Sequence, residues 1–311
     1  MKLFKYKFFK TGIVVLLSAF IMAGCEKDET GTTAVPTEST DAKIAGKSDL
    51  SLFQAALIKT RLDVFTKGGG PFTIWAPTNA GFNAIGINTA ADLNMIDSNL
   101  LVQIITYHIQ AGGRSFTEIP LGPNATMTTQ GGFTQYASRK VGGSAFINGV
   151  QVTEPNIRTS NGYMHVINRV LIPPFFNMAI SLGLNPNYKL MLQAFAKTAT
   201  ATATSPLTIF AVPNNVMVAA GYDSTAIATA AGPALVTLTS IMKYHTVNRR
   251  IFSSDFVAGN LKTVQGTNVV IGTGTSVTVK GTNNTGAFQI TNTDFISTTG
   301  VIHAINGLLK P

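Results

Sequence analysis

The sequence contains one line twice, and this repeat constrains the fold more than any other feature. Residues 162–173 (GYMHVINRVLIP) recur as residues 300–311 (GVIHAINGLLKP), 138 positions later. Gly, His, Ile, Asn, Leu and Pro return at matching places. A period of this length indicates two copies of one domain rather than a solenoid of short units. The second copy is expected to close at the last residue of the sequence.

Two further segments repeat in the same order. Residues 72–82 (FTIWAPTNAGF) return as 207–217 (LTIFAVPNNVM), and the Tyr-His pair at 107–108 returns at 244–245. Early in each copy, apolar residues follow the three- and four-residue spacing of helices, and later they alternate as in half-buried strands. The sequence therefore predicts an α+β fold in each copy, with helices first and strands second.

The N-terminus is predicted to be a signal peptide over residues 1–24. Four lysines precede an apolar stretch at 11–23, which is shorter than the roughly 20 residues that span a bilayer. Small residues then precede Cys25, the single cysteine of the chain. This segment resembles a bacterial lipobox, which implies that Cys25 is lipidated. The alternative is an ordinary signal peptide followed by a free cysteine.

Residues 25–42 are predicted to form a flexible acidic tether. Their net charge is −4 and they hold few large apolar side chains, so burial cannot offset the entropy of ordering them. The acidic run at 26–29 resembles the export signal of Bacteroidetes-type surface lipoproteins. That resemblance implies an outer-membrane protein exposed on the cell surface, with the periplasmic leaflet as the alternative.

The folded part is basic, but its charges are scattered. Residues 43–311 hold 18 Lys and Arg against 9 Asp and Glu, a net charge of +9. The sequence shows no basic stripe with interleaved aromatic residues, so nucleic acid is not an expected partner.

The three repeated blocks together resemble the conserved blocks of fasciclin-like domains. The resemblance implies two tandem domains, over residues 43–174 and 175–311, each with a β-sandwich-like core of two sheets set against a helical group. It also implies adhesion or protein interaction, with Tyr107, His108, Tyr244 and His245 as candidate interaction residues.

Read from the residues alone, the histidines favour a structural role. All four lie in repeated blocks, at 108, 165, 245 and 303. A zinc site needs three or four ligands, whereas each domain offers two histidines and no cysteine, so no metal site is expected. Asn168 and Asn306 fall within an apolar line predicted to be the last strand, so we expect them to be buried and hydrogen-bonded. Trp75 is expected in the core.

No catalytic motif occurs in the sequence, so no catalytic residue and no cofactor is expected. The predicted function is that of a lipid-anchored cell-envelope protein, held to the membrane by Cys25, whose domains contact an extracellular protein or glycan. The alternatives are a glycan- or nutrient-capture accessory protein beside an outer-membrane transporter, and a purely structural envelope protein.

Overall fold

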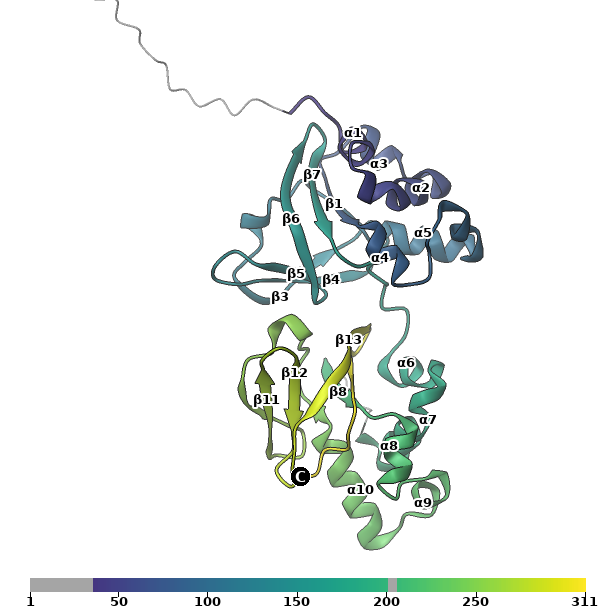
Figure 1. Ribbon diagram of the computed structural model, residues 1–311, viewed down its shortest axis with the longest axis vertical. Coiled ribbons are helices and arrows are strands. Elements are labelled where there is room, and N and C mark those ends of the chain that lie inside the picture. Colours follow the sequence, from purple (N-terminus) through teal and green to yellow (C-terminus); the bar gives the residue numbers. More distant parts are fainter. Residues whose placement is uncertain (1–35, 201–205) are drawn as a thin grey trace, which may run out of the picture. The chain divides into compact units, whose positions relative to one another are not determined.

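The computed structural model describes residues 36–200 and 206–311 (Figure 1). The predicted signal peptide, Cys25 and most of the predicted tether lie outside the described residues. In Figure 1 the helices of each domain lie together to one side of its sheet. Within the two described stretches, no helix is both long and apolar enough to cross a membrane.

The first domain opens with helices and closes with strands, as the sequence predicts. Its helices are α1 (Thr40–Ala45), α2 (Ser51–Thr60), α3 (Val64–Lys67), α4 (Asn79–Asn83) and α5 (Ser98–Thr106). Its strands are β1 (Phe72–Pro77), β2 (Ile109–Ala111), β3 (Gly122–Thr128), β4 (Thr134–Arg139), β5 (Ala145–Ile147), β6 (Val150–Thr159) and β7 (Gly162–Ile167).

The second domain repeats this order. Its helices are α6 (Met178–Leu184), α7 (Lys189–Thr198), α8 (Asn214–Ala219), α9 (Ser224–Thr229) and α10 (Gly232–Tyr244). Its strands are β8 (Leu207–Ala211), β9 (Thr246–Val247), β10 (Gly259–Lys262), β11 (Asn268–Thr273), β12 (Val277–Lys280), β13 (Phe288–Ser297) and β14 (Gly300–Ile305).

The strands of each domain form one seven-stranded sheet, and the two sheets have equivalent strand orders. They are β2-β1-β7-β6-β5-β4-β3 and β9-β8-β14-β13-β12-β11-β10. The ten-residue strands β6 and β13 pair on both sides, which joins the two expected sheets of each domain. The repeated line forms β7 and β14, which lie inside the order and are mostly buried, as predicted.

The closing strand of each domain runs parallel to its first strand at very short range. Gly162 pairs with Phe72, and Gly300 pairs with Leu207. A Cβ atom on Gly162 would lie 1.9 Å from the Phe72 carbonyl oxygen, and one on Gly300 would lie 2.0 Å from that of Leu207. No side chain fits there, and this explains the glycine that opens both copies of the repeated line.

Three local expectations need correction. The folded part begins inside the predicted tether, because α1 starts at Thr40, whose backbone N–H donates to Asn161 Oδ1. Strand β7 ends at Ile167, whereas the apolar pattern continues to residue 172. Asn168 and Asn306 follow the strands and are exposed rather than buried. Asn306 still fixes a neighbour, because its Oδ1 accepts a hydrogen bond from the Gln289 N–H.

Gly162→Ala is predicted to destabilise the protein by about 2–4 kcal/mol, because the new methyl group collides with backbone that cannot move alone. Urea unfolding of the variant measures this. Gly274→Ala is the matched control, since nothing lies within 4 Å of its added Cβ. Equal stabilities for the two variants would contradict the close approach of β1 and β7.

Candidate functional site

The histidine of each Tyr-His pair fastens the end of a helix to the segment beyond the closing strand. His108 Nε2 accepts from the Leu171 N–H at 2.9 Å, so its proton lies on Nδ1 and is donated to the Ile104 carbonyl at 2.8 Å. His245 likewise accepts from the Leu309 N–H at 2.9 Å. Leu171 and Leu309 are equivalent positions of the repeated line, so both domains are closed by the same bond.

The tyrosine of each pair fastens the helix end to the sheet. Tyr107 Oη donates to the Thr134 carbonyl at 2.9 Å and accepts from Asn148 Nδ2 at 2.8 Å. Tyr244 Oη donates to the Asn268 carbonyl at 2.6 Å and accepts from the Thr282 N–H at 2.9 Å. Burial raises the pKa of Tyr107, so its hydroxyl stays protonated.

Tyr107, His108, Tyr244 and His245 are all fully buried. A partner that docks on the surface therefore does not touch them. An interaction role for these four residues stays a prediction, and in this fold it would have to act through the surface that they support.

The other two histidines hold a bulge in the strand before the closing strand. His165 Nδ1 accepts from the Asn156 N–H at 3.1 Å, and Nε2 donates to the Arg114 carbonyl at 3.0 Å. His303 makes the same two bonds, with the Asp294 N–H at 3.3 Å and the Ile251 carbonyl at 2.8 Å.

The four histidines do not form a metal centre in the described residues, where no three His, Cys, Asp or Glu side chains gather around a point. Burial lowers the pKa of His108, His165 and His245 to about 4, and it also lowers the pKa of His303. Each ring is therefore neutral at pH 7 and serves as a donor-acceptor link between backbone groups.

The bulge residue differs between the domains in one important way. Asn156 and Asp294 both adopt a φ of 63°. Asn156 Oδ1 accepts from the Phe116 N–H, and Asp294 Oδ1 accepts from the Ser253 N–H at 2.6 Å. The aspartate, however, has a second charged oxygen that the asparagine lacks.

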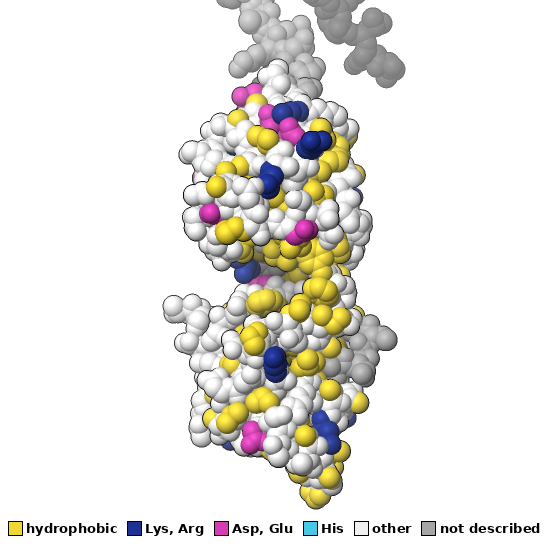
Figure 2. Space-filling model, turned by 90° about the vertical axis from the view of Figure 1, so that its right-hand side faces the viewer, with side chains coloured by type: hydrophobic (Ala, Val, Ile, Leu, Met, Phe, Trp, Pro, Cys, Tyr) yellow, Lys and Arg dark blue, Asp and Glu magenta, His cyan; other side chains and the backbone are white. Residues whose placement is uncertain are grey.

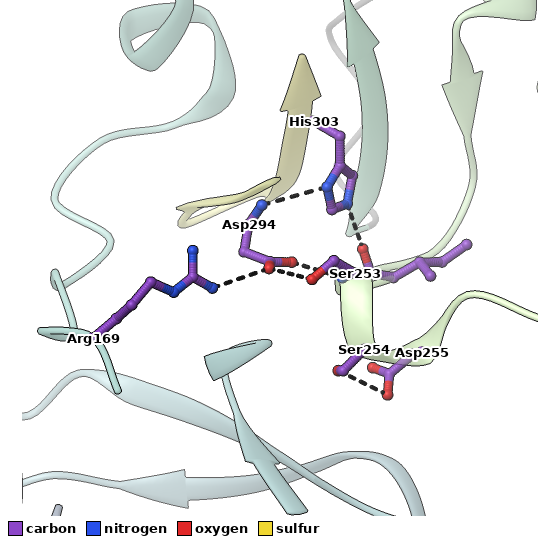
Figure 3. A network of polar contacts seen from close by, with 7 residues as sticks. Arg169, Ser253, Ser254, Asp255, Asp294 and His303 are labelled. Carbon is purple, nitrogen blue, oxygen red and sulfur yellow. Dashed lines mark hydrogen bonds and ion pairs between the residues drawn. The ribbon is translucent and has the colours of Figure 1, made fainter. Parts of the chain in front are cut away.

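That second oxygen reaches the first domain. Asp294 Oδ2 accepts from Ser253 Oγ and forms an ion pair with Arg169 Nη2 at 3.3 Å, as Figure 3 shows. The Asp294 side chain is 2% exposed and that of Arg169 is 40% exposed. A Cβ atom on Gly149 would lie 2.5 Å from Asp294 Cγ, so the first domain has a glycine where the aspartate approaches.

Further contacts between the two domains lie around the loop at 249–256. Asn124 Nδ2 donates to the Arg250 carbonyl at 3.0 Å, and the Arg250 guanidinium lies 4.1 Å from the Tyr136 ring centroid. Ser138 Oγ donates to Asp255 Oδ2 at 3.0 Å. Charge, hydrogen bonds and a cation–π contact thus join the domains in one arrangement.

Beside these contacts lies a cavity of about 870 Å³ with walls from both domains. The first domain contributes residues 122–124 and 138–141, and the second contributes 249–251, 254–258 and parts of β10 and β11. Neither domain alone forms the cavity. It is the candidate functional site that the sequence did not predict.

A family model for the fasciclin domain matches residues 48–173 and 186–311, so the chain belongs to the fasciclin domain family. Two tandem domains with a mixed α+β fold are therefore confirmed. The chain is also similar to a solved FAS1 domain pair from the insect cell adhesion molecule fasciclin I, with 19% identity and a TM-score of 0.40 over 83% of this chain and 98% of that one.

Curated bacterial proteins are more similar in sequence. Protein sll1483 of Synechocystis sp. is 28% identical over 171 residues, which are 53% of this chain and 92% of that protein. The cell surface glycolipoprotein MPB83 of Mycobacterium bovis is 33% identical over 112 residues, which are 36% of this chain and 48% of that protein. The chain thus spans about half the length of this mycobacterial relative.

The contacts between the domains were missed by the sequence reading, although a signal for them exists. Arg169 stands where the second copy has Gly307, and Asp294 stands where the first copy has Asn156. Arg169 lies within the repeated line and Asp294 lies outside it, and at both positions the two copies carry different residues.

Stability is predicted to fall between pH 6.5 and about 5, before most carboxylates titrate. An unfolded histidine has a pKa near 6.5, whereas the buried rings have a lowered pKa, so below pH 6.5 the unfolded state binds more protons. Stability is thus full above pH 6.5 and falls as the pH drops toward 4, by at most about 3 kcal/mol for each of His108, His165 and His245. Urea unfolding at pH 7.0 and 5.2 measures the loss, and identical midpoints at both pH values would refute buried neutral histidines.

A double-mutant cycle on Arg169→Gln and Asp294→Asn is predicted to give a coupling energy of about 0.5–2 kcal/mol in urea unfolding. Asp294→Asn keeps an acceptor for the Ser253 N–H, and it replaces the charged oxygen that meets Arg169 and Ser253 Oγ by an amide nitrogen. The control cycle uses Lys67 and Asp63, whose side chains are 57% and 19% exposed, and a smaller coupling is expected for this surface pair. Zero coupling at Arg169 and Asp294 would show that the ion pair does not join the domains.

Proposed function

We propose that the chain is a lipid-anchored cell-envelope protein whose two fasciclin domains make extracellular contacts, either in adhesion or with a partner protein. The family match across both domains is the observation that carries this proposal. The signal peptide with Cys25 supports the anchor, and one relative is itself a cell surface glycolipoprotein.

The repeated residues make hydrogen bonds and close packing contacts inside each domain. This supports a role for the protein in binding a partner rather than in catalysis. The repeated Gly, Tyr and His side chains are occupied in closing each domain. What the two domains present to a partner is therefore the surface between the repeated blocks, where loops and helix faces vary.

One such surface lies at the junction of the domains. Figure 2 shows hydrophobic side chains gathered near the junction on the face that it presents. The linker and the first helix of the second domain expose four large apolar side chains in sequence order: Ile172, Phe176, Ile180 and Leu184. We call these four residues the junction patch. Exposed apolar side chains that gather on one face often mark protein–protein contact sites.

The contacts between the domains add to this role. Because Asp294, Arg169 and the Arg250 loop join the domains, the junction patch has a defined shape rather than one that changes with a free linker. A preformed surface loses less entropy on binding. The acidic tether would then hold this surface away from the membrane.

Capture of a small ligand beside an outer-membrane transporter is the second candidate function. The cavity between the domains is the observation that favours it.

Cells that express the wild-type chain are predicted to keep it in the membrane fraction, to lose its domains to external protease and to attach to neighbouring cells or matrix. The Cys25→Ala chain should leave the membrane fraction, and attachment should fall to the level of cells that lack the gene. Fractionation, protease shaving and a washed-plate attachment assay measure the three effects.

Variants that remain anchored separate location from contact in the same assay. Phe176→Ser with Ile180→Ser changes the junction patch and should reduce attachment at least severalfold. Val236→Ser on α10 is the matched control, because its side chain is 70% exposed and lies outside the patch. Full protection from protease, or attachment equal to that of cells lacking the gene, would overturn the proposed function.

A further inference from the structure

The cavity between the domains has the size of a small-molecule site. Its volume of about 870 Å³ lies within the range of about 300–1,000 Å³ that such sites occupy. Its walls carry both charged and apolar side chains, and these fall on different parts of the surface. The charge and polarity of these lining side chains indicate which class of ligand the cavity can bind.

The charged part of the wall is strongly positive. Four cationic side chains line it, Arg139, Lys140, Arg249 and Arg250, against a single acid, Asp255. None of the ion pairs between described residues includes any of these four cations. Positive side chains at a partly enclosed cavity concentrate anionic ligands.

The four cations are not equally free to bind. Arg250 is engaged, because its Nη1 donates to the Gly300 carbonyl at 3.1 Å and its guanidinium covers the Tyr136 ring. The Arg139 guanidinium lies 6.0 Å from the Phe116 ring centroid, and its Nε–H is buried without an acceptor among the described residues. A buried donor without a partner is unusual and costs free energy until an acceptor arrives. Arg249 and Lys140 are exposed.

The single acid does not neutralise this group. The Asp255 carboxylate accepts from Ser138 Oγ at 3.0 Å and from Ser254 Oγ at 3.2 Å, and burial raises its pKa. Its two oxygens are thus held by serines rather than by arginine. Asn124 Oδ1, on the strand beside Arg139, is a second buried atom without a partner and can accept a bond from a hydroxyl group or a water that accompanies the ligand.

The remaining wall is apolar. Phe256, Leu261 and Ile271 line it as buried side chains. Val141 and Val257 are 91% and 79% exposed, one from each domain. An anion that is polar throughout would lose water against this wall without gaining hydrogen bonds, and that loss is costly. The apolar wall therefore argues against an acidic sugar and for a ligand with an apolar body.

We infer that the cavity binds an amphiphilic carboxylate, with its head group between Arg139 and Arg249 and its hydrocarbon part against Phe256, Leu261 and Ile271. Because Arg139 belongs to the first domain and the other four residues to the second, the site exists only where the domains are joined. This inference goes beyond the adhesive role and does not depend on it.

The test is calorimetric titration of the full-length Cys25→Ala chain, purified without detergent, with decanoate below its micelle concentration. Saturable binding with one site per chain is expected. Decanol, which has the chain without the charge, and trigalacturonate, which has the charge without the chain, should each bind at least tenfold more weakly.

Variants locate the site. Arg139→Gln should weaken decanoate binding at least tenfold, whereas Arg158→Gln, an equal change of charge on an exposed part of β6, should leave it unchanged. Val257→Asp adds a like charge at an exposed position that lines the cavity and should also weaken binding at least tenfold. Thermal unfolding of each variant confirms that the fold is kept.

Three results would overturn the inference: no saturable decanoate binding, decanoate binding that Arg139→Gln leaves unchanged, or trigalacturonate binding tighter than decanoate. The readout uses purified chain in solution. Failure here is therefore distinct from failure of the attachment assay, which tests the proposed function.

Discussion

The parallel contact between the first and last strands of each domain is the constraint on which the rest of the structure depends. It requires the chain to leave the first strand, form the helices and strands that follow, and return to pair beside that first strand. The contact leaves no room for a side chain at Gly162 or Gly300. The buried His108 and His245 then fix the chain just beyond the closing strand. Sequence repetition is strongest where this closure is made, because few residue types satisfy it.

Both domains are closed by the same residue types at equivalent positions. This repetition also explains how much of the fold could be predicted from the sequence. The repeat predicted the number of domains, the order of helices before strands, and the last strand of each domain, since glycine spacing and apolar alternation are local signals. The exposure of Asn168 and Asn306 was not foreseen, because an apolar line does not mark where its strand ends. The contacts of Asp294 with Arg169, and the cavity beside them, join residues more than 100 positions apart and leave no periodic pattern.

The residues of the two copies thus have two roles: some make bonds inside a domain, and others make contacts between the domains. Positions that repeat, such as Tyr107 and Tyr244, make equivalent bonds inside each domain. Positions that have diverged, such as Asn156 and Asp294, keep a shared backbone bond while one of them gains a partner in the other domain. A single charged oxygen in place of an amide is enough for this, because the bulge already holds the side chain in place. The cavity also depends on both copies, since each domain supplies only part of its wall.

The replacement of Arg169 by Gly307 in the second copy has a consequence for assembly. The junction uses Arg169 and Gly149 from one domain and Asp294 from the other, so it is a head-to-tail contact between unlike surfaces. Contacts of this type can extend into open filaments when every unit carries both surfaces. Here the second domain has glycine where the arginine would be needed, and the first domain has neutral Asn156 where the aspartate would be needed. The residues at the equivalent positions therefore cannot form the same ion pair with a second copy of the chain.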